Sequence, residues 1–247
     1  MPSKDIYFYT HFAPEVRIHL ESGAFRALCK HLNDRSDSVQ NIDLMIVGGF
    51  GRNCLAKWLV KEARNLSANS EHPNPKDAAL LDAFGHSQAT REVYGCDFFR
   101  WKKKYPQKTS FEQMQKYQES ESIHAVHKED KMLKSGMTVA MTQDFEQKFK
   151  MSLEAGAFRS LLEHLSDRSD IVQNIELMTI SGFCRNCLAK VRCVCMCDLI
   201  VHQGCQRILN LLQCFFLTFS GWWLKHAICR PPLRECVRNL SLMKKIS

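Results

Sequence analysis

The chain has 247 residues and a formal net charge of +8, and 45% of its residues are hydrophobic while 24% are charged. This balance is typical of a folded globular protein and excludes a highly charged disordered chain. Most of the positive charge lies in residues 191–247, which hold eight Lys or Arg against Asp198 and Glu235. Residues 1–190 are therefore nearly neutral and carry no specific nucleic-acid signal.

The first predicted helix begins at Ile18. Residues 1–17 show no clear period, so we expect a loose arm there. From Ile18 to Leu32 apolar residues recur on one helical face, with charged residues away from it. This pattern is typical of an amphipathic helix.

A second helix is predicted after a short polar break. Asp37 and Gln40 have the spacing of a capping box, and the same spacing recurs at Asp170 and Gln173. Apolar residues follow as far as the glycine pair at 48–49, which either ends the helix or lets another backbone approach closely.

The remaining periodic segments are also helical. Helices are predicted at residues 52–65, at 75–94 with a break near Gly85, at 97–102 and at 110–120, where Ser110 and Gln113 have capping-box spacing. No stretch alternates apolar and polar residues between hairpin turns. The sequence therefore predicts an all-α fold.

One part of the chain occurs twice. Residues 20–57 (the first copy) align with residues 153–190 (the second copy) at a constant offset of 133, and 27 of the 38 paired residues are identical. The similarity ends abruptly at Lys190. Lys-Val-Arg at 190–192 is what a codon followed by an intron donor would encode, so our hypothesis is that residues 191–247 are translated intron.

The repeat predicts the domain organisation. We expect a complete helical domain at 18–118, a linker at 119–143, a truncated second copy at 144–190, and an aberrant Cys-rich, basic and apolar tail at 191–247. Seven of the twelve cysteines follow Lys190, unlike the even spread of a secreted disulfide framework. The chain does not open with the succession typical of a secretory signal, so we expect a cytoplasmic protein.

Several short motifs resemble a known family. They are Phe25-Arg26, His31-Leu32, Arg35-Ser36-Asp37, Val39-Gln40-Asn41-Ile42-Asp43-Leu44-Met45, Gly49-Phe50, Arg52-Asn53-Cys54-Leu55, Lys57-Trp58, Tyr94-Gly95, Trp101-Lys102 and Tyr105. Together they resemble the domain-of-unknown-function family numbered 1244 over one whole member, residues 18–118. The resemblance implies a small multihelical domain without an established activity.

The two copies differ at a family cysteine. The family pattern is Phe-Cys-Arg-Asn-Cys, as at residues 183–187, whereas Gly51 replaces the first cysteine in the first copy. A second copy of this size has too little surface to bury a core alone. We expect it to dock on the first copy, through a face that single-domain relatives would use for self-association. The alternative is a second copy that is partly disordered.

Cys184 and Cys187 are the first candidate site. Their spacing brings two thiols to one side of a helical turn, which suits a redox pair or half of a zinc site. Further ligand types follow at Cys193, Cys195, Cys197, His202 and Cys205, but their spacing does not match a second paired-cysteine knuckle. The alternative is that both are packing cysteines.

A polar cluster is the second candidate site. It comprises His31, Asp34, Arg35, Asp37, Arg52 and Asn53 with their counterparts His164, Asp167, Arg168, Asp170, Arg185 and Asn186. These side chains suit cation binding, acid-base chemistry or an anion pocket at a helix start. The structural alternative is that the carboxylates cap helices, the arginines pair within the fold and the histidines lie at helix C-termini.

Two remaining segments give weaker signals. Residues 101–105 mix basic and aromatic side chains, which we interpret as a solvated face rather than a nucleic-acid site. The apolar run at 208–224 is interrupted by polar residues and is short for a membrane span, so we expect no membrane contact.

No phosphate loop, nucleophile elbow or paired-carboxylate motif supports an enzyme. The preferred prediction is a non-catalytic helical interaction module with a protein partner or self-association. The alternative is a metal-binding or thiol-redox protein that uses Cys184 and Cys187.

Overall fold

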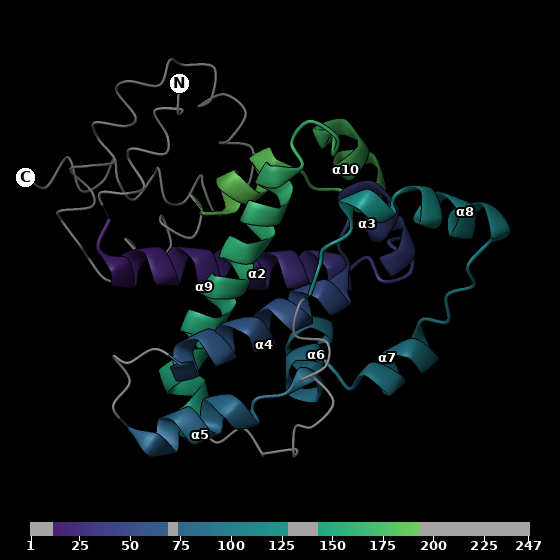
Figure 1. Cartoon of the computed structure of the whole chain (residues 1–247). Coiled ribbons are helices and arrows are strands. Elements are labelled where there is room, and N and C mark those ends of the chain that lie inside the picture. The colour runs from purple at the N-terminus through teal and green to yellow at the C-terminus, as the bar shows by residue number, and fades with distance from the viewer. Residues whose placement is uncertain (1–11, 69–73, 128–142, 193–247) are drawn as a thin grey trace, which may run out of the picture. The chain divides into compact units, whose positions relative to one another are not determined.

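The computed structural model describes residues 12–68, 74–127 and 143–192 (Figure 1). Every regular element within these residues is a helix, which confirms the predicted all-α class. The chain divides into a unit of residues 1–192 and a unit of residues 193–247. The predicted tail lies outside the described residues except for residues 191 and 192, and the fold below is that of the first unit.

Within the described residues, seven α-helices precede the second copy. They are α2 (Pro14–Asn33), α3 (Asn41–Gly48), α4 (Arg52–Ala68), α5 (Pro75–Ala83), α6 (His86–Tyr94), α7 (Phe98–Lys104) and α8 (Phe111–Glu119), followed by a 3-10 turn, η1 (Glu121–Ile123). The second copy forms α9 (Gln143–Asp167), α10 (Asn174–Ser181) and a helical stretch at 185–192. It thus repeats the α2, α3, α4 order and lacks counterparts of the later helices in the described residues.

Two predicted helix starts differ from the structure. The first helix begins at Pro14, so residues 14–17 belong to it rather than to the expected arm; proline at the first helical position needs no backbone donor. The capping box at Asp37 and Gln40 is wrong, because Gln40 is itself the N-cap and its side chain makes no capping hydrogen bond. Val39 N donates to Arg35 O at 2.8 Å, so a turn still encloses Asp37.

The corresponding start in the second copy is wrong for the same reason. Gln173 is the N-cap of α10 without a side-chain capping bond, and Val172 N donates to Arg168 O across Asp170. The box at Ser110 and Gln113 is confirmed, since each side chain bonds the backbone of the other residue.

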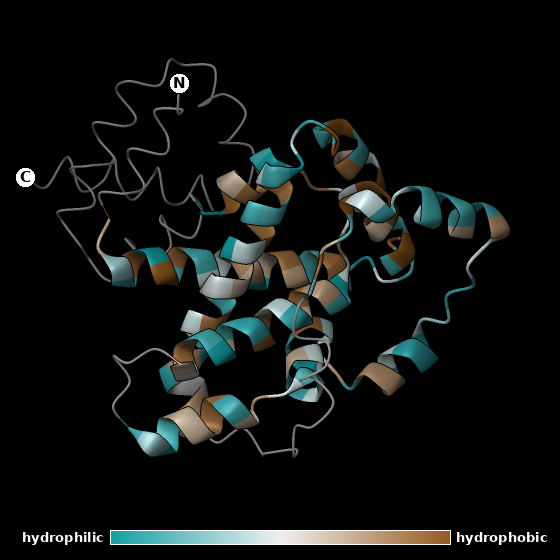
Figure 2. Ribbon diagram, viewed as in Figure 1, coloured by the Kyte–Doolittle hydropathy of each residue, from teal (hydrophilic) through white to brown (hydrophobic). Residues whose placement is uncertain are grey.

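Helix α4 lies at the centre of the fold. Leu55, Leu59 and Ala63 on α4 are fully buried, and α5, α6 and α9 all pack against this helix. Helix α9 also crosses α2 (Figure 1), and Phe25 on α2 and Phe158 on α9 are buried in the same hydrophobic cluster. In Figure 2 hydrophobic and hydrophilic residues alternate in bands along α2 and α4, as amphipathic helices require. The two copies therefore share one core.

The glycine pair at 48–49 both ends a helix and permits a close approach. Gly49 has a φ of 69° at the C-cap of α3, a left-handed conformation that favours glycine. A Cβ on Gly49 would overlap the carbonyl group of Ile123, and Ala125 N donates to Gly49 O at 2.7 Å. The chain leaving η1 thus passes directly over Gly49 on its way to the second copy.

Candidate functional site

Contacts between the two copies join equivalent residues in reciprocal fashion. His164 Nε2 on α9 lies 2.8 Å from the carbonyl oxygen of Gly48. His31 Nε2, the counterpart of His164, lies 2.8 Å from the carbonyl oxygen of Ser181, the counterpart of Gly48. Because a carbonyl oxygen only accepts, both rings donate from Nε2. For His31 this tautomer leaves Nδ1 to accept from Arg35 Nη1 at 3.1 Å.

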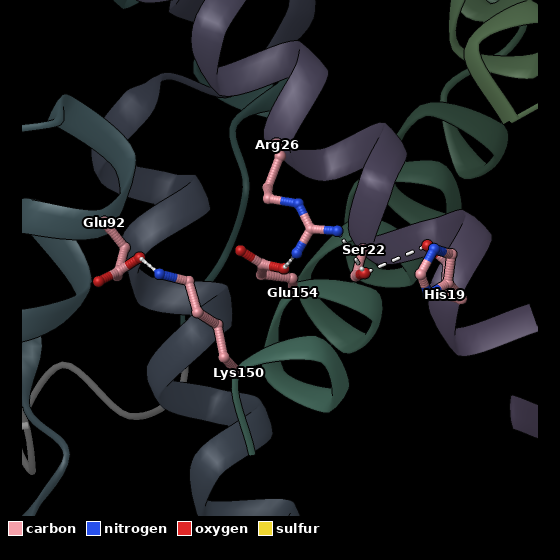
Figure 3. A network of polar contacts seen from close by, with 6 residues as sticks. All are labelled: His19, Ser22, Arg26, Glu92, Lys150 and Glu154. Carbon is pink, nitrogen blue, oxygen red and sulfur yellow. Dashed lines mark hydrogen bonds and ion pairs between the residues drawn. The ribbon is translucent and has the colours of Figure 1, made fainter. Parts of the chain in front are cut away.

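Charged pairs follow the same reciprocity. Arg26 Nη1 lies 2.7 Å from Glu154 Oε2 (Figure 3), and the counterparts Arg159 Nε and Glu21 Oε2 are 3.7 Å apart. Only 3% of Glu21 and 4% of Glu154 are exposed, so both carboxylates are removed from water. A buried carboxylate needs its cationic partner, because an unpaired charge in the interior is costly.

Aromatic rings meet where the two copies cross. The centroids of Phe50 and its counterpart Phe183 are 6.3 Å apart. The Phe50 centroid lies 6.0 Å from that of His164, and the Phe183 centroid lies 5.8 Å from that of His31. A residue that contacts its own counterpart marks the axis of a two-fold arrangement.

These contacts define an interface that resembles a symmetric dimer within one chain. We call it the inter-copy interface; it comprises Glu21, Arg26, His31, Gly48 and Phe50 with Glu154, Arg159, His164, Ser181 and Phe183. In an isologous contact residue i of one partner meets residue j of the other while j meets i. The His–carbonyl and Arg–Glu pairs satisfy this definition.

Burial shifts the pKa values of two groups in the interface. It raises the pKa of Glu154 to about 7, and Arg26 opposes this shift without cancelling it. Burial lowers the pKa of His164 to about 4, against the opposing effect of its bond to Gly48 O. His164 is therefore neutral near pH 7, in agreement with its role as a donor from one ring nitrogen.

The predicted arginines bond inside each copy. Arg52 is fully buried and donates to the carbonyl oxygens of Leu32 at 2.6 Å and Val39 at 3.0 Å. Its counterpart Arg185 donates to the carbonyls of Leu165 at 2.6 Å and Val172 at 2.7 Å. Both arginines thus close the corner between the first two helices of their copy, and their bonding capacity is directed to the backbone rather than to an anion pocket.

The other members of the polar cluster separate. Asp34, Asp37, Asp167 and Asp170 are exposed, and Asp34 pairs with Lys30 on its own helix at 2.6 Å. Asn53 accepts from the Tyr94 hydroxyl at 2.8 Å, whereas Asn186 is exposed. Arg168 donates to the carbonyl oxygens of His164 and His124. The structure therefore directs the histidines to the inter-copy interface and the aspartates to solvent.

Cys184 and Cys187 lie together at the start of the helical stretch at 185–192. Their sulfur atoms are 3.7 Å apart, Cys184 is buried, and burial raises the pKa of Cys187. A raised pKa lowers the thiolate fraction that attacks a disulfide or binds a metal. No group of three or more His, Cys, Asp or Glu side chains suited to a metal ion occurs in the described part of the chain. The further candidate ligands from Cys193 onward lie outside it.

Sequence reasoning missed the charged pairs of the interface. Glu21, Arg26, Glu154 and Arg159 were not among the candidates, although the repeat retains both Glu and Arg at an offset of 133. Residues 21 and 154 fall among apolar neighbours of amphipathic helices. A retained charge in a buried segment is the signal that could have identified them.

The fold and its paired interface define a small all-α domain accompanied by a partial second copy. The family model described as "Protein of unknown function (DUF1244)" matches residues 39–119 and 172–193. The first of these segments matches a full copy and the second a truncated copy, as the repeat predicted. No curated protein and no solved structure matches the chain. No helix among residues 12–68, 74–127 and 143–192 is long and apolar enough to cross a membrane.

Proposed function

We propose that the chain is a non-catalytic helical interaction module whose binding surface is formed by α2, α3 and α4. One observation carries this proposal: this surface already binds a second set of helices through reciprocal, buried polar pairs. An apolar centre with a few well-placed hydrogen bonds and charged pairs is the composition of a specific protein interface.

A small cavity lies beside the contact between α4 and α9. It lies between α4, α6 and α9 and has a volume of about 10 Å³, lined by Leu59, Glu92, Phe145, Lys150, Leu153 and Glu154. This is the volume of about one water molecule, whereas pockets for small ligands measure hundreds of Å³.

The Arg26–Glu154 pair tests whether α9 is held as a bound ligand. Arg26→Glu places two carboxylates against each other. This substitution is expected to lower the free energy that holds α9 against the first domain by about 2 kcal/mol, which corresponds to about thirtyfold faster amide exchange in α9. Arg26 is half exposed, so its replacement leaves the packing within the first domain in place. Amide exchange in α4 and α6 is therefore expected to stay slow. Hydrogen exchange of the full chain, resolved by peptide, measures both regions.

Two further variants make this test specific. The charge-swapped chain R26E/E154R is expected to restore protection of α9, because the pair is reformed with opposite polarity. The matched control is Lys30→Glu on the same helix, which breaks only the exposed pair with Asp34. Slow exchange of α9 in the Arg26→Glu chain, or no recovery in the charge-swapped chain, would contradict the proposal.

One observation favours the alternative function in metal binding or thiol redox chemistry: the two thiols at Cys184 and Cys187 lie 3.7 Å apart. As a redox pair they would form a disulfide when oxidised, and as zinc ligands they would need two further donors. The raised pKa of Cys187 weakens both roles at neutral pH.

Metal retention discriminates between the two functions. After equilibration with zinc and removal of free metal, the full chain is expected to retain well below one zinc per chain. The Cys184→Ser chain is expected to retain the same amount, because packing cysteines bind no metal. Stoichiometric zinc that disappears in the Cys184→Ser chain would favour the alternative instead.

A further inference from the structure

The inter-copy interface contains a complete self-complementary surface on its first-copy side. We propose that this surface also pairs with the same surface of a second chain, so that the first domain is built to form a symmetric homodimer, and that the second copy occupies the surface and keeps the chain monomeric. This inference rests on the proposed function, and it names the partner as a second copy of this chain.

The first copy supplies counterparts of all five second-copy residues of the inter-copy interface. Each of the five second-copy residues in the interface has its counterpart in the first copy, and the sole change is Gly48 for Ser181, which contributes only a backbone carbonyl. Two chains would therefore form the Arg26–Glu21 pair twice and the His31–Gly48 carbonyl bond twice. Phe50 would contact Phe50 of the partner on the axis, as it contacts Phe183 here.

The outer surface of the second copy leaves room for a complete domain. In the first domain, Asn41 donates to Tyr94 on α6 at 3.1 Å and Asp43 accepts from Gln113 on α8 at 2.8 Å, so these helices cover α3. The counterparts on α10, Asn174 and Glu176, are exposed, as are Ile175 and Met178. A complete domain in this position would place its α6 and α8 over that open surface.

One additional ion pair favours the second copy over a second chain. Lys148 on α9 pairs with Asp77 on α5, whereas its counterpart in the first copy is Glu15, which would face Asp77 with like charge. Attachment through the segment at 128–142 also converts binding of the second copy into an intramolecular event, with an effective concentration on the order of millimolar. Dimerisation is therefore expected only when the second copy is displaced.

Substitutions confined to the second copy free the surface without changing it. Glu154→Arg places an arginine against Arg26, and a Cβ at residue 156 would overlap the side chain of Glu62, so Gly156→Leu blocks the contact between α9 and α4. The full chain with E154R/G156L is measured by light scattering at about 20 µM. The mass is expected to double from the 28.5 kDa of the wild-type monomer.

Charge reversal in the first copy identifies the surface used. Adding Glu21→Arg to the E154R/G156L chain is expected to return the mass to that of a monomer, because the introduced guanidinium group would face Arg26 of the partner with like charge. Adding both Glu21→Arg and Arg26→Glu is expected to restore the dimer with the pair reversed. The second copy stays displaced in this chain because of Gly156→Leu and of the like charge that Glu21→Arg sets against Arg159, although Arg26→Glu again complements Glu154→Arg. The control is hydrogen exchange of α4 and α6 in each chain, which is expected to stay as slow as in the wild type if the first domain remains folded.

Three outcomes would overturn the inference: a wild-type dimer, a dimer that persists with Glu21→Arg, or a monomeric E154R/G156L chain in which α9 exchanges rapidly. The last result would contradict the dimer and would still agree with the proposed function, because α9 would be displaceable from the surface while no second chain binds there. If E154R/G156L unfolds α4, the single Glu154→Arg chain is used in the same comparison and the same outcomes apply.

Discussion

Replacing Arg52 by alanine is expected to lower the free energy of unfolding by about 3–5 kcal/mol. Arg52 is fully buried, and its guanidinium group donates to Leu32 O, Val39 O and Asn41 Oδ1. Its guanidinium carbon also lies 5.4 Å from the centroid of the Trp101 ring. Alanine leaves the buried carbonyls without donors and a cavity beside the ring, and both effects destabilise the corner between α2 and α3.

The duplication offers a matched control for this prediction. Arg185 makes the same three kinds of bond in the second copy, but it is partly exposed, so water can replace the lost donors. Arg185→Ala is expected to cost about 1–2 kcal/mol. Urea unfolding followed by circular dichroism measures both variants. Equal losses would show that burial of the Arg52 guanidinium is not the source of its effect.

The second large effect is a pair of opposing pH dependences in the inter-copy interface. The pKa of Glu154 is about 7 in the folded chain against an ordinary value of 4.5. Between pH 4.5 and 7 the unfolded chain therefore loses a proton that the folded chain keeps, and stability falls as pH rises. Arg26, Lys150 and Glu92 are the charged groups that affect this carboxyl (Figure 3).

His164 acts in the opposite direction. Its pKa is about 4 in the folded chain against an ordinary value of 6.5, so between pH 6.5 and 4 the unfolded chain gains a proton that the folded chain excludes. Stability therefore falls as pH drops. The charged groups that act on His164 are Arg168, Arg185 and Asp167. The two effects overlap between pH 4.5 and 6.5 and largely cancel in the wild-type chain.

Single substitutions are expected to reveal each effect. The Glu154→Gln chain keeps only the His164 effect. As the pH rises from 4.5 to 7, its free energy of unfolding should increase by on the order of 2 kcal/mol relative to that of the wild type. The His164→Gln chain keeps only the Glu154 effect and should show the opposite slope. Thermal unfolding at half-unit pH steps measures the differences from wild type. Parallel profiles for all three chains would disprove both assignments.

Local signals in the sequence predicted the helices well. The break near Gly85 separates α5 from α6, and the box at Ser110 and Gln113 starts α8, because glycine conformation and capping bonds depend on residues within one turn. The box predicted at Asp37 is wrong, since a turn closed by Val39 N and Arg35 O delays the helix. Spacing alone does not distinguish a cap from a turn residue.

The candidate site was only partly predictable, because its contacts join distant segments. His31 and His164 were identified as notable, yet the partner of each is a backbone carbonyl about 116 to 150 residues away in sequence. Arg52 was assigned to a polar cluster, but its acceptors depend on how the chain turns after Leu32. Periodicity shows which side of a helix is buried and does not show what lies against it. The domain boundaries at 18–118 and 144–190 stay a prediction.

Reciprocal contacts within a single polypeptide change how mutations accumulate. When two identical chains pair, one codon change alters both symmetric contacts, so its cost is doubled. Here a substitution at Arg26 or at Arg159 alters one contact and leaves the other, and the two ion pairs already differ, at 2.7 and 3.7 Å. Each half of the repeat can therefore drift by small steps, so that a once equivalent pair becomes specialised.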